Sequence, residues 1–192
     1  VMNNESQNLT YYTSDCTFHV ALFLKYVGTP VVILGCLGNF FSILVFSRPA
    51  LRSRSCSKYF LALSVSDINV LVAYTLENLL YHGYDIQLLS NSLMCKSVIF
   101  LIYASTDISN YLLALAAVDR CILIANSDIR HRFCRKSTAK LLMILVVVLF
   151  SLINGHFLFG FQIDGDGRCL PTSEIYIYFY INHYDSYIDI VK

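Results

Sequence analysis

Residues 26–47 read YVGTPVVILGCLGNFFSILVFS and contain no charged side chain. An α-helix needs about 20 apolar residues to cross the hydrocarbon core of a bilayer, and this stretch is long enough to do so. Three further windows, at residues 59–81, 97–118 and 141–163, meet the same requirement. Backbone amides need internal partners in hydrocarbon, and the short alternating segments of a membrane β-barrel do not recur in this sequence. We therefore expect an all-α, polytopic membrane helix bundle.

The composition supports this class. Hydrophobic residues make up 56% of the 192 residues and charged residues only 14%, whereas soluble domains carry about 25% charged residues. The sequence contains no nucleophile–base pair and no metal-ligand spacing. We expect the lipid bilayer to be a partner, and we do not expect an enzyme, a nucleic-acid-binding protein or a structural metal centre.

The positive charges predict the orientation. Most of the 14 Lys and Arg residues lie in two connecting segments, 48–58 and 119–140. The positive-inside rule places these segments in the cytoplasm and the N-terminus outside the cell, so we expect a multi-pass protein of the plasma membrane. Glycosylation sequons at Asn4 and Asn8 agree with an extracellular N-terminus.

This topology divides the chain into alternating helices and loops. The expected segments are an extracellular tail at 1–19, helix one at 20–47, a cytoplasmic loop at 48–57, helix two at 58–81, an extracellular loop at 82–91, helix three at 92–124, a cytoplasmic loop at 125–137, helix four at 138–161, an extracellular loop at 162–185, and the start of helix five at 186–192.

Polar side chains inside the spans are the first candidates for function, because a charged side chain in a bilayer is costly and typically marks a working site. Asn39 lies deep in the first span and Asp67 well inside the second, and we expect Asp67 to face the bundle interior. Asp107 interrupts the third span. Its carboxylate either lines a ligand cavity or satisfies a neighbouring hydroxyl, such as that of Thr106 or Tyr103.

The third span also carries a polar group at each end. From Cys95 to Arg120 is 25 residues, which corresponds to about 37 Å of helix. This length places the cysteine at the outer surface and the arginine at the inner one. Cys16, Cys95 and Cys169 all fall on the oxidising outer side, where disulfides form. Three cysteines leave one without a local partner.

In these features the chain resembles the rhodopsin-like (class A) family of G-protein-coupled receptors. The motifs occur in the family's order and on the expected sides of the membrane: Gly38-Asn39, Leu61-Ala62 with Asp67, Cys95, Asp119-Arg120, and Cys169. The resemblance covers about residues 20–192, which correspond to helices one to four and the start of helix five. Helices six and seven are absent from this stretch, so we expect a fragment, the N-terminal part of a seven-transmembrane receptor.

The resemblance implies a switch at the inner end of helix three. Asp119 would pair with the neighbouring Arg120 in the inactive state, and Arg120 would turn toward a heterotrimeric G protein on activation. Cys121 occupies the third position of this motif, where the family usually has an aromatic residue. Two further departures are the lack of any tryptophan and of a proline in helix four.

The resemblance also implies two further sites. Asp67 and Ser109, with Asn39 nearby, stand where the family builds a sodium and water network, so a sodium ion is the one cofactor that we consider. The alternative is a hydrogen bond between Asp67 and Asn39 without an ion. Cys95 and Cys169 would form a disulfide between the outer end of helix three and the second outer loop.

Residues in helix three and in the second outer loop indicate which class of ligand to expect. The family's amine receptors have an aspartate where this chain has Ile102, and vertebrate-type opsins have a glutamate where it has Val98. We expect a ligand pocket near Ile102, Tyr103 and Asp107. Asp-Gly turns between short apolar runs at 161–170 predict a hairpin. The outer loop is acidic, with Asp164, Asp166, Glu174, Asp185 and Asp189 against the single Arg168.

An acidic outer loop attracts cationic ligands, so an extracellular neuropeptide is the ligand class that the sequence favours. Two alternatives come from other classes of membrane protein. A transporter or channel fragment would be expected to show an internal repeat or a broken helix. A four-helix membrane scaffold would need a large cysteine-rich outer loop or a paired-cysteine motif.

Overall fold

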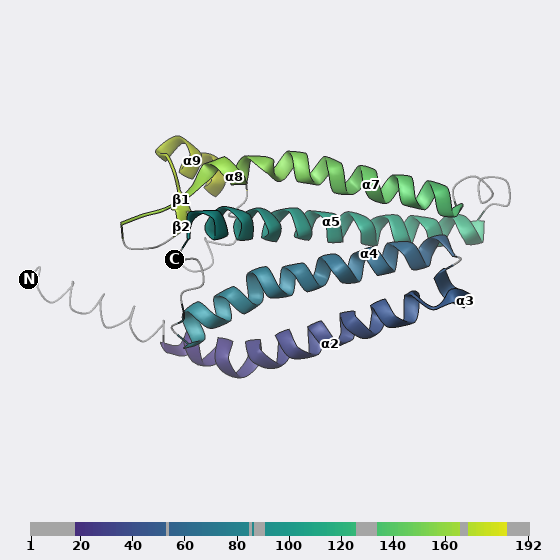
Figure 1. The fold of residues 1–192 in the computed structure, drawn as a ribbon, viewed down its shortest axis with the longest axis horizontal. Helices are drawn as coiled ribbons and strands as arrows, with labels where there is room; N and C mark the ends of the chain where they lie inside the picture. The colour runs from purple at the N-terminus through teal and green to yellow at the C-terminus, as the bar shows by residue number, and fades with distance from the viewer. Residues whose placement is uncertain are drawn as a thin grey trace, which may run out of the picture.

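In the part of the chain that the structure describes, four long helices lie side by side along the longest axis (Figure 1). The computed structural model describes residues 18–52, 54–84, 86, 91–125, 134–165 and 169–183. The helical segments long and apolar enough to cross a membrane are Phe18–Phe46, Ser55–Tyr81, Ser92–Ile124 and Lys136–Gly160. These bounds lie close to those expected from the sequence, and the fold class is confirmed.

The labelled elements follow from these four segments. The first contains η1 (Leu24–Gly28) and α2 (Thr29–Phe46), and the second contains α4 (Ser55–Val70), η2 (Leu71–Leu76) and η3 (Leu79–Gly83). The third is the single helix α5 (Ser92–Ala125), and the fourth joins α7 (Lys136–Ile153), η4 (Asn154–His156) and α8 (Phe157–Gly160). α5 lies between α4 and α7, and α2 packs on α4 (Figure 1).

The two ends of the bundle differ in structure. At one end, α3 (Pro49–Arg52) joins α2 to α4 within the predicted cytoplasmic loop. At the opposite end, β1 (Phe161–Ile163) and β2 (Cys169–Pro171) pair antiparallel, with Gln162 opposite Leu170. This pairing confirms the hairpin that the Asp-Gly turns predicted. We call these the α3 end and the hairpin end.

The predicted outer loop at 162–185 contains more regular structure than expected. Residues Glu174–His183 form helix α9, whereas they were predicted to be part of a loop, with the next helix beginning at 186. The helix starts there because the Ser173 hydroxyl accepts a hydrogen bond from the Tyr176 amide, at 3.2 Å, and because Glu174 stands in the first turn. Residues 186–192 lie outside the described part of the chain.

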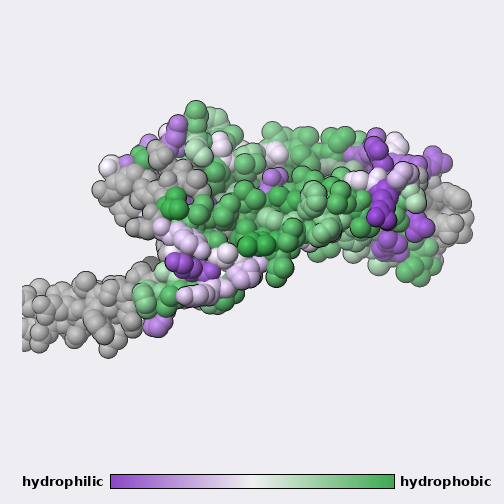
Figure 2. Space-filling view, turned by 60° about the horizontal axis from the view of Figure 1, so that its bottom comes forward, coloured by the Kyte–Doolittle hydropathy of each residue, from purple (hydrophilic) through white to green (hydrophobic). Residues whose placement is uncertain are grey.

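The outer surface of the bundle is apolar. Large side chains such as Leu34 and Phe41 are 68% and 60% exposed, and Figure 2 shows hydrophobic residues along the middle of the bundle with hydrophilic ones toward its two ends, most densely at the α3 end. Side chains buried between the helices form two clusters. One lies around Tyr59 and Leu112, and the other around Phe157 at the hairpin end. An apolar exterior of this kind fits a helix bundle that faces lipid.

A close contact with Gly160 fixes α9 against the end of α8. A Cβ atom at Gly160 would lie 2.0 Å from Cζ of Tyr176, whereas one at Gly155 would meet nothing within 4 Å. We expect Gly160→Ala to force the Tyr176 ring out of place and to lower the free energy of unfolding by roughly 1–3 kcal/mol. Thermal unfolding of the purified protein in detergent measures this loss.

Gly155→Ala is the matched control, since it makes the same change one helical turn away and in open space. Equal melting temperatures for the two variants would contradict the packing described for Tyr176.

Candidate functional site

Asp119 lies toward the α3 end of α5 and is completely buried. One carboxylate oxygen accepts a hydrogen bond from the Ser55 hydroxyl at 3.0 Å. Its other oxygen, Oδ1, has no hydrogen-bond partner among the described residues. Ser55 begins α4, so this bond joins the first turn of α4 to the last turns of α5.

Arg120 is exposed and contacts a different residue. Its Nε donates to Sγ of Cys56 at 2.9 Å. Among the described residues, the hydrogen bond of the Asp119 carboxylate therefore comes from Ser55 and that of the Arg120 guanidinium goes to Cys56. Consecutive residues on a helix do not face one another, which explains why each contacts its own partner on α4. Cys121 is exposed on the same turn.

Asp67 and Ser109 come together in the middle of the bundle. The Ser109 hydroxyl donates to Oδ1 of Asp67, and the nearby Ser66 hydroxyl donates to the backbone carbonyl of Ser105 at 3.2 Å. Asp67 therefore faces the neighbouring helix α5, as expected. Asn39 does not join this pair, because its amide donates to the Gly35 carbonyl of its own helix at 3.1 Å.

Asp107 has a partner on the fourth membrane-spanning segment. Nδ2 of Asn154 donates to Oδ2 of Asp107 at 2.9 Å and to the Phe150 carbonyl at 2.9 Å. Thr106 and Tyr103 were the hydroxyls considered as an alternative to a ligand cavity. Thr106 donates to the Ile102 carbonyl, and the hydroxyl of Tyr103 shares a hydrogen bond with another tyrosine.

Asn154 was a detectable candidate. It is a single amide within a long apolar stretch, and a polar side chain at that depth needs a partner on another helix or in its own backbone. Asn154 is completely buried, and its Oδ1 has no hydrogen-bond partner in the described structure. Like Asp67, Asn154 is a polar side chain within a predicted membrane span, and the cost of placing it in hydrocarbon marks it as a candidate.

Aromatic rings fill the hairpin end of the bundle. Tyr103 stacks on Phe157 with ring centroids 4.4 Å apart, and its hydroxyl shares a hydrogen bond with that of Tyr180 on α9. Phe161 and Tyr180 meet edge to face at 5.5 Å. Ile102, which precedes Tyr103 in the sequence, is half-buried. Tyr103 therefore belongs to the packed contact between α5, α8 and α9.

A disulfide joins the hairpin to α5. Cys95 and Cys169 are bonded, with Cα atoms 5.7 Å apart, and Cys95 is completely buried. This confirms the predicted pairing, and such a link typically stabilises a fold by about 2–4 kcal/mol. Cys16, the third outer cysteine, lies outside the described residues, as do the sequons at Asn4 and Asn8.

Comparison with known families supports this arrangement. The sequence model of the family described as "7 transmembrane receptor (rhodopsin family)" matches residues 38–181. That range includes Asp67, the Asp119-Arg120 pair and both disulfide cysteines. A search of curated proteins found no match.

The contact between Asp107 and Asn154 yields a stability test. We expect Asp107→Ala and Asn154→Ala to be coupled in a double-mutant cycle, because either substitution removes the same hydrogen bond between the two helices. The coupling energy expected for such a pair between membrane helices is about 0.6–1.7 kcal/mol. Unfolding in detergent measures the free energy of each variant.

Thr106→Ala combined with Asn154→Ala provides the control cycle, since the Thr106 hydroxyl bonds only within its own helix. A coupling energy as large in this control as in the test cycle would rule out a specific contact.

Proposed function

The chain belongs to the rhodopsin family of seven-transmembrane receptors, and we propose that it transmits the binding of an extracellular neuropeptide to a heterotrimeric G protein. Members of this family are receptors and not enzymes. Membership of a receptor family also argues against a transporter, a channel or a membrane scaffold protein.

The arrangement at the inner end of α5 is the observation that carries the proposal. Asp119 is buried and tied to α4, whereas Arg120 is exposed at the level of the basic segments. A guanidinium at the surface can bind a protein partner. The buried carboxylate beside it can exchange its hydrogen bond when the packing of the helices changes. This is the chemistry that a two-state receptor needs at its inner face.

The proposed orientation places the hairpin end outside the cell. The basic segments then lie in the cytoplasm, and the sequons at Asn4 and Asn8 lie outside, in agreement with the positive-inside rule. On this orientation the protein is a multi-pass protein of the plasma membrane. The disulfide-linked hairpin then stands at the entrance for an extracellular ligand.

The charge of the outer segment supports a cationic peptide as the ligand. Asp164 and Glu174 lie at the hairpin end, and the same segment of the sequence also contains Asp166, Asp185 and Asp189. Ile102 occupies the position at which the family's amine receptors carry an aspartate, which argues against a small amine. A peptide contacts a wide outer surface and benefits from charge attraction during its approach.

The test uses a seven-helix receptor that contains residues 1–192, expressed in cells and exposed to synthetic neuropeptides of graded charge. We expect basic peptides to activate a G protein. We expect Arg120→Ala to reduce that activation by about tenfold or more, because charge-assisted hydrogen bonds to the G protein are lost. Energy transfer between labelled G-protein subunits measures activation, and surface labelling measures expression.

Arg48→Ala serves as a control, because Arg48 is another exposed basic residue toward the α3 end. A loss of signalling as large in Arg48→Ala as in Arg120→Ala would count against a specific role for Arg120. Activation by amines alone would exclude the peptide ligand.

We further propose that Asp67 binds a sodium ion in the complete receptor. The Asp67 carboxylate and the Ser109 hydroxyl bring two oxygen ligands together, and hard cations prefer such oxygens. The remaining ligands would come from water or from helices beyond those described. Asn39 is occupied by its own backbone, so a direct hydrogen bond from Asn39 does not replace the ion.

Asp67→Asn should remove the dependence of peptide affinity on sodium, because the amide can still accept the Ser109 hydrogen bond but carries no charge. Peptide affinity is measured in sodium and in a bulky organic cation at equal ionic strength. Ser109→Ala keeps the charge and should retain most of the dependence. An unchanged sodium dependence in Asp67→Asn would favour a hydrogen-bonded carboxylate without an ion.

A further inference from the structure

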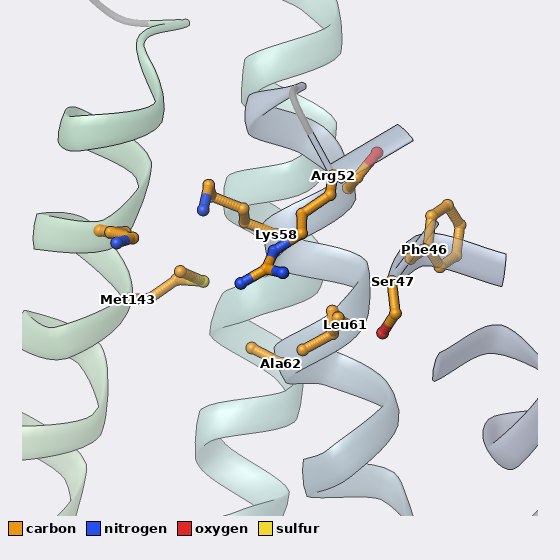
Figure 3. Close-up of a pocket in the computed structure, with 9 residues that line it drawn as sticks. Phe46, Ser47, Arg52, Lys58, Leu61, Ala62 and Met143 are labelled. Carbon is orange, nitrogen blue, oxygen red and sulfur yellow. The ribbon is translucent and has the colours of Figure 1, made fainter. Parts of the chain in front are cut away.

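A pocket of about 390 Å³ opens at the α3 end between α2, α4 and α7. Its volume falls within the range of roughly 300–1,000 Å³ that is typical of ligand sites. Basic and apolar residues line it together, chiefly Arg52, Lys58, Lys140, Leu61, Ala62 and Met143. In Figure 3, Arg52 and Lys58 extend over the space between α4 and α7, and Met143 extends into it from the opposite side.

The cations of this pocket lie close together without a balancing charge. Lys58 is repelled by the positive charges of Lys140, Arg52 and Lys136. No acidic side chain is among the described residues that line the pocket. Cations held at such short range favour an anionic ligand, and they favour one with several negative charges over one with a single charge.

The lower part of the pocket continues into the lipid-facing surface. Val65 on α4 and Val147 on α7 each follow a lining residue by four positions, Leu61 and Met143 respectively, and so lie on the same helix faces one turn further into the bilayer. They are 46% and 43% exposed. The polar α3 end therefore borders directly on apolar surface (Figure 2), and an acyl chain would extend along this path.

The depth of the basic residues matches the headgroup layer. Lys58 lies in the first turn of α4 and Lys140 in the second turn of α7, so both stand within about 6 Å of the helix ends. Lysines at such positions place their ammonium groups at the membrane interface. A ligand held by them would have its charged part in that interface and its apolar part in the hydrocarbon.

We propose that this pocket binds a phosphoinositide of the cytoplasmic leaflet, with its phosphorylated inositol ring held by Arg52, Lys58 and Lys140 and an acyl chain against Leu61, Ala62 and Met143. Each phosphate monoester carries about −1.5 to −2 charges, which suits three clustered cations. Phosphatidylserine fits less well, because its headgroup brings an ammonium toward these cations. The inference rests on the orientation given with the proposed function.

The test measures binding of a fluorescent dioctanoyl phosphatidylinositol bisphosphate to the full-length protein purified in detergent. We expect Lys58→Gln and Lys140→Gln each to weaken binding by about fivefold. Arg135→Gln is the matched control, since Arg135 is exposed at the start of α7 and does not line the pocket. Its affinity should change by less than about twofold.

Ala62→Leu tests the apolar part, because the larger side chain fills the pocket and leaves the charge unchanged. It should weaken the lipid too. If this variant does not fold, the two lysine variants still decide the outcome. Competition experiments distinguish the lipid from other anionic ligands. Inositol trisphosphate, which has no acyl chains, and dioctanoyl phosphatidylserine should each displace the probe only at concentrations at least about tenfold higher than the unlabelled phosphoinositide.

Three results would overturn the inference. They are an equal loss of affinity in Arg135→Gln, displacement by inositol trisphosphate or phosphatidylserine at the same concentration as the unlabelled phosphoinositide, and unchanged affinity in both lysine variants. Glycosylation tags placed in the loop at 48–58 test the orientation separately. Modification of those tags would disprove the proposed orientation and with it this site, whereas an unmodified loop without selective lipid binding would disprove this inference alone.

Discussion

A polar side chain surrounded by hydrocarbon needs a partner, and in this protein the partners of α5 hold the bundle together. α5 bonds to α4 through Ser109 and Asp67, and again through Asp119 and Ser55. It bonds to the end of α7 through Asp107 and to the hairpin through the disulfide of Cys95. Between membrane helices apolar contacts bring little specificity, because lipid tails are equally apolar. The polar links therefore determine which helix faces α5, and at which depth.

The helix that contains α2 shows the contrast. Its polar side chains Thr29, Asn39 and Ser42 all donate to carbonyls of their own helix, four residues earlier. It is held instead by close packing, as where a Cβ on Gly35 would lie 2.8 Å from Leu71. Contacts of this kind slide more easily than hydrogen bonds break. A rearrangement of the bundle that preserves the links of α5 is therefore easiest at α2. A rearrangement at the α3 end of α5 has to break the hydrogen bond between Asp119 and Ser55.

Depth in the membrane could be predicted from the sequence, but rotation about each helix axis could not. Counting residues placed Cys95 and Arg120 at opposite surfaces and located the spans within a few residues of their observed ends. The pairing of Asp67 with Ser109 followed from the resemblance to a family. The partner of Asp107 was missed because Asn154 lies 47 residues away, and no periodicity in the sequence relates the two helix faces. The bond from Ser55 was missed for the same reason.

The lack of tryptophan and proline in the fourth spanning helix left open how that helix packs, and the contacts of α7 supply an answer. Ala139 is completely buried near the α3 end, where its small side chain lets α7 approach its neighbours. Further along, the rings of Phe150 and Tyr111 on α5 lie 4.3 Å apart. One turn later Asn154 reaches Asp107 and also bonds the Phe150 carbonyl. Because the amide donates to the carboxylate in a medium without water, this hydrogen bond fixes the contact between α5 and α7 as a large ring would by packing alone. A polar pair also carries a requirement that a ring does not, since a change of Asn154 removes the hydrogen bond that the Asp107 carboxylate accepts within the membrane.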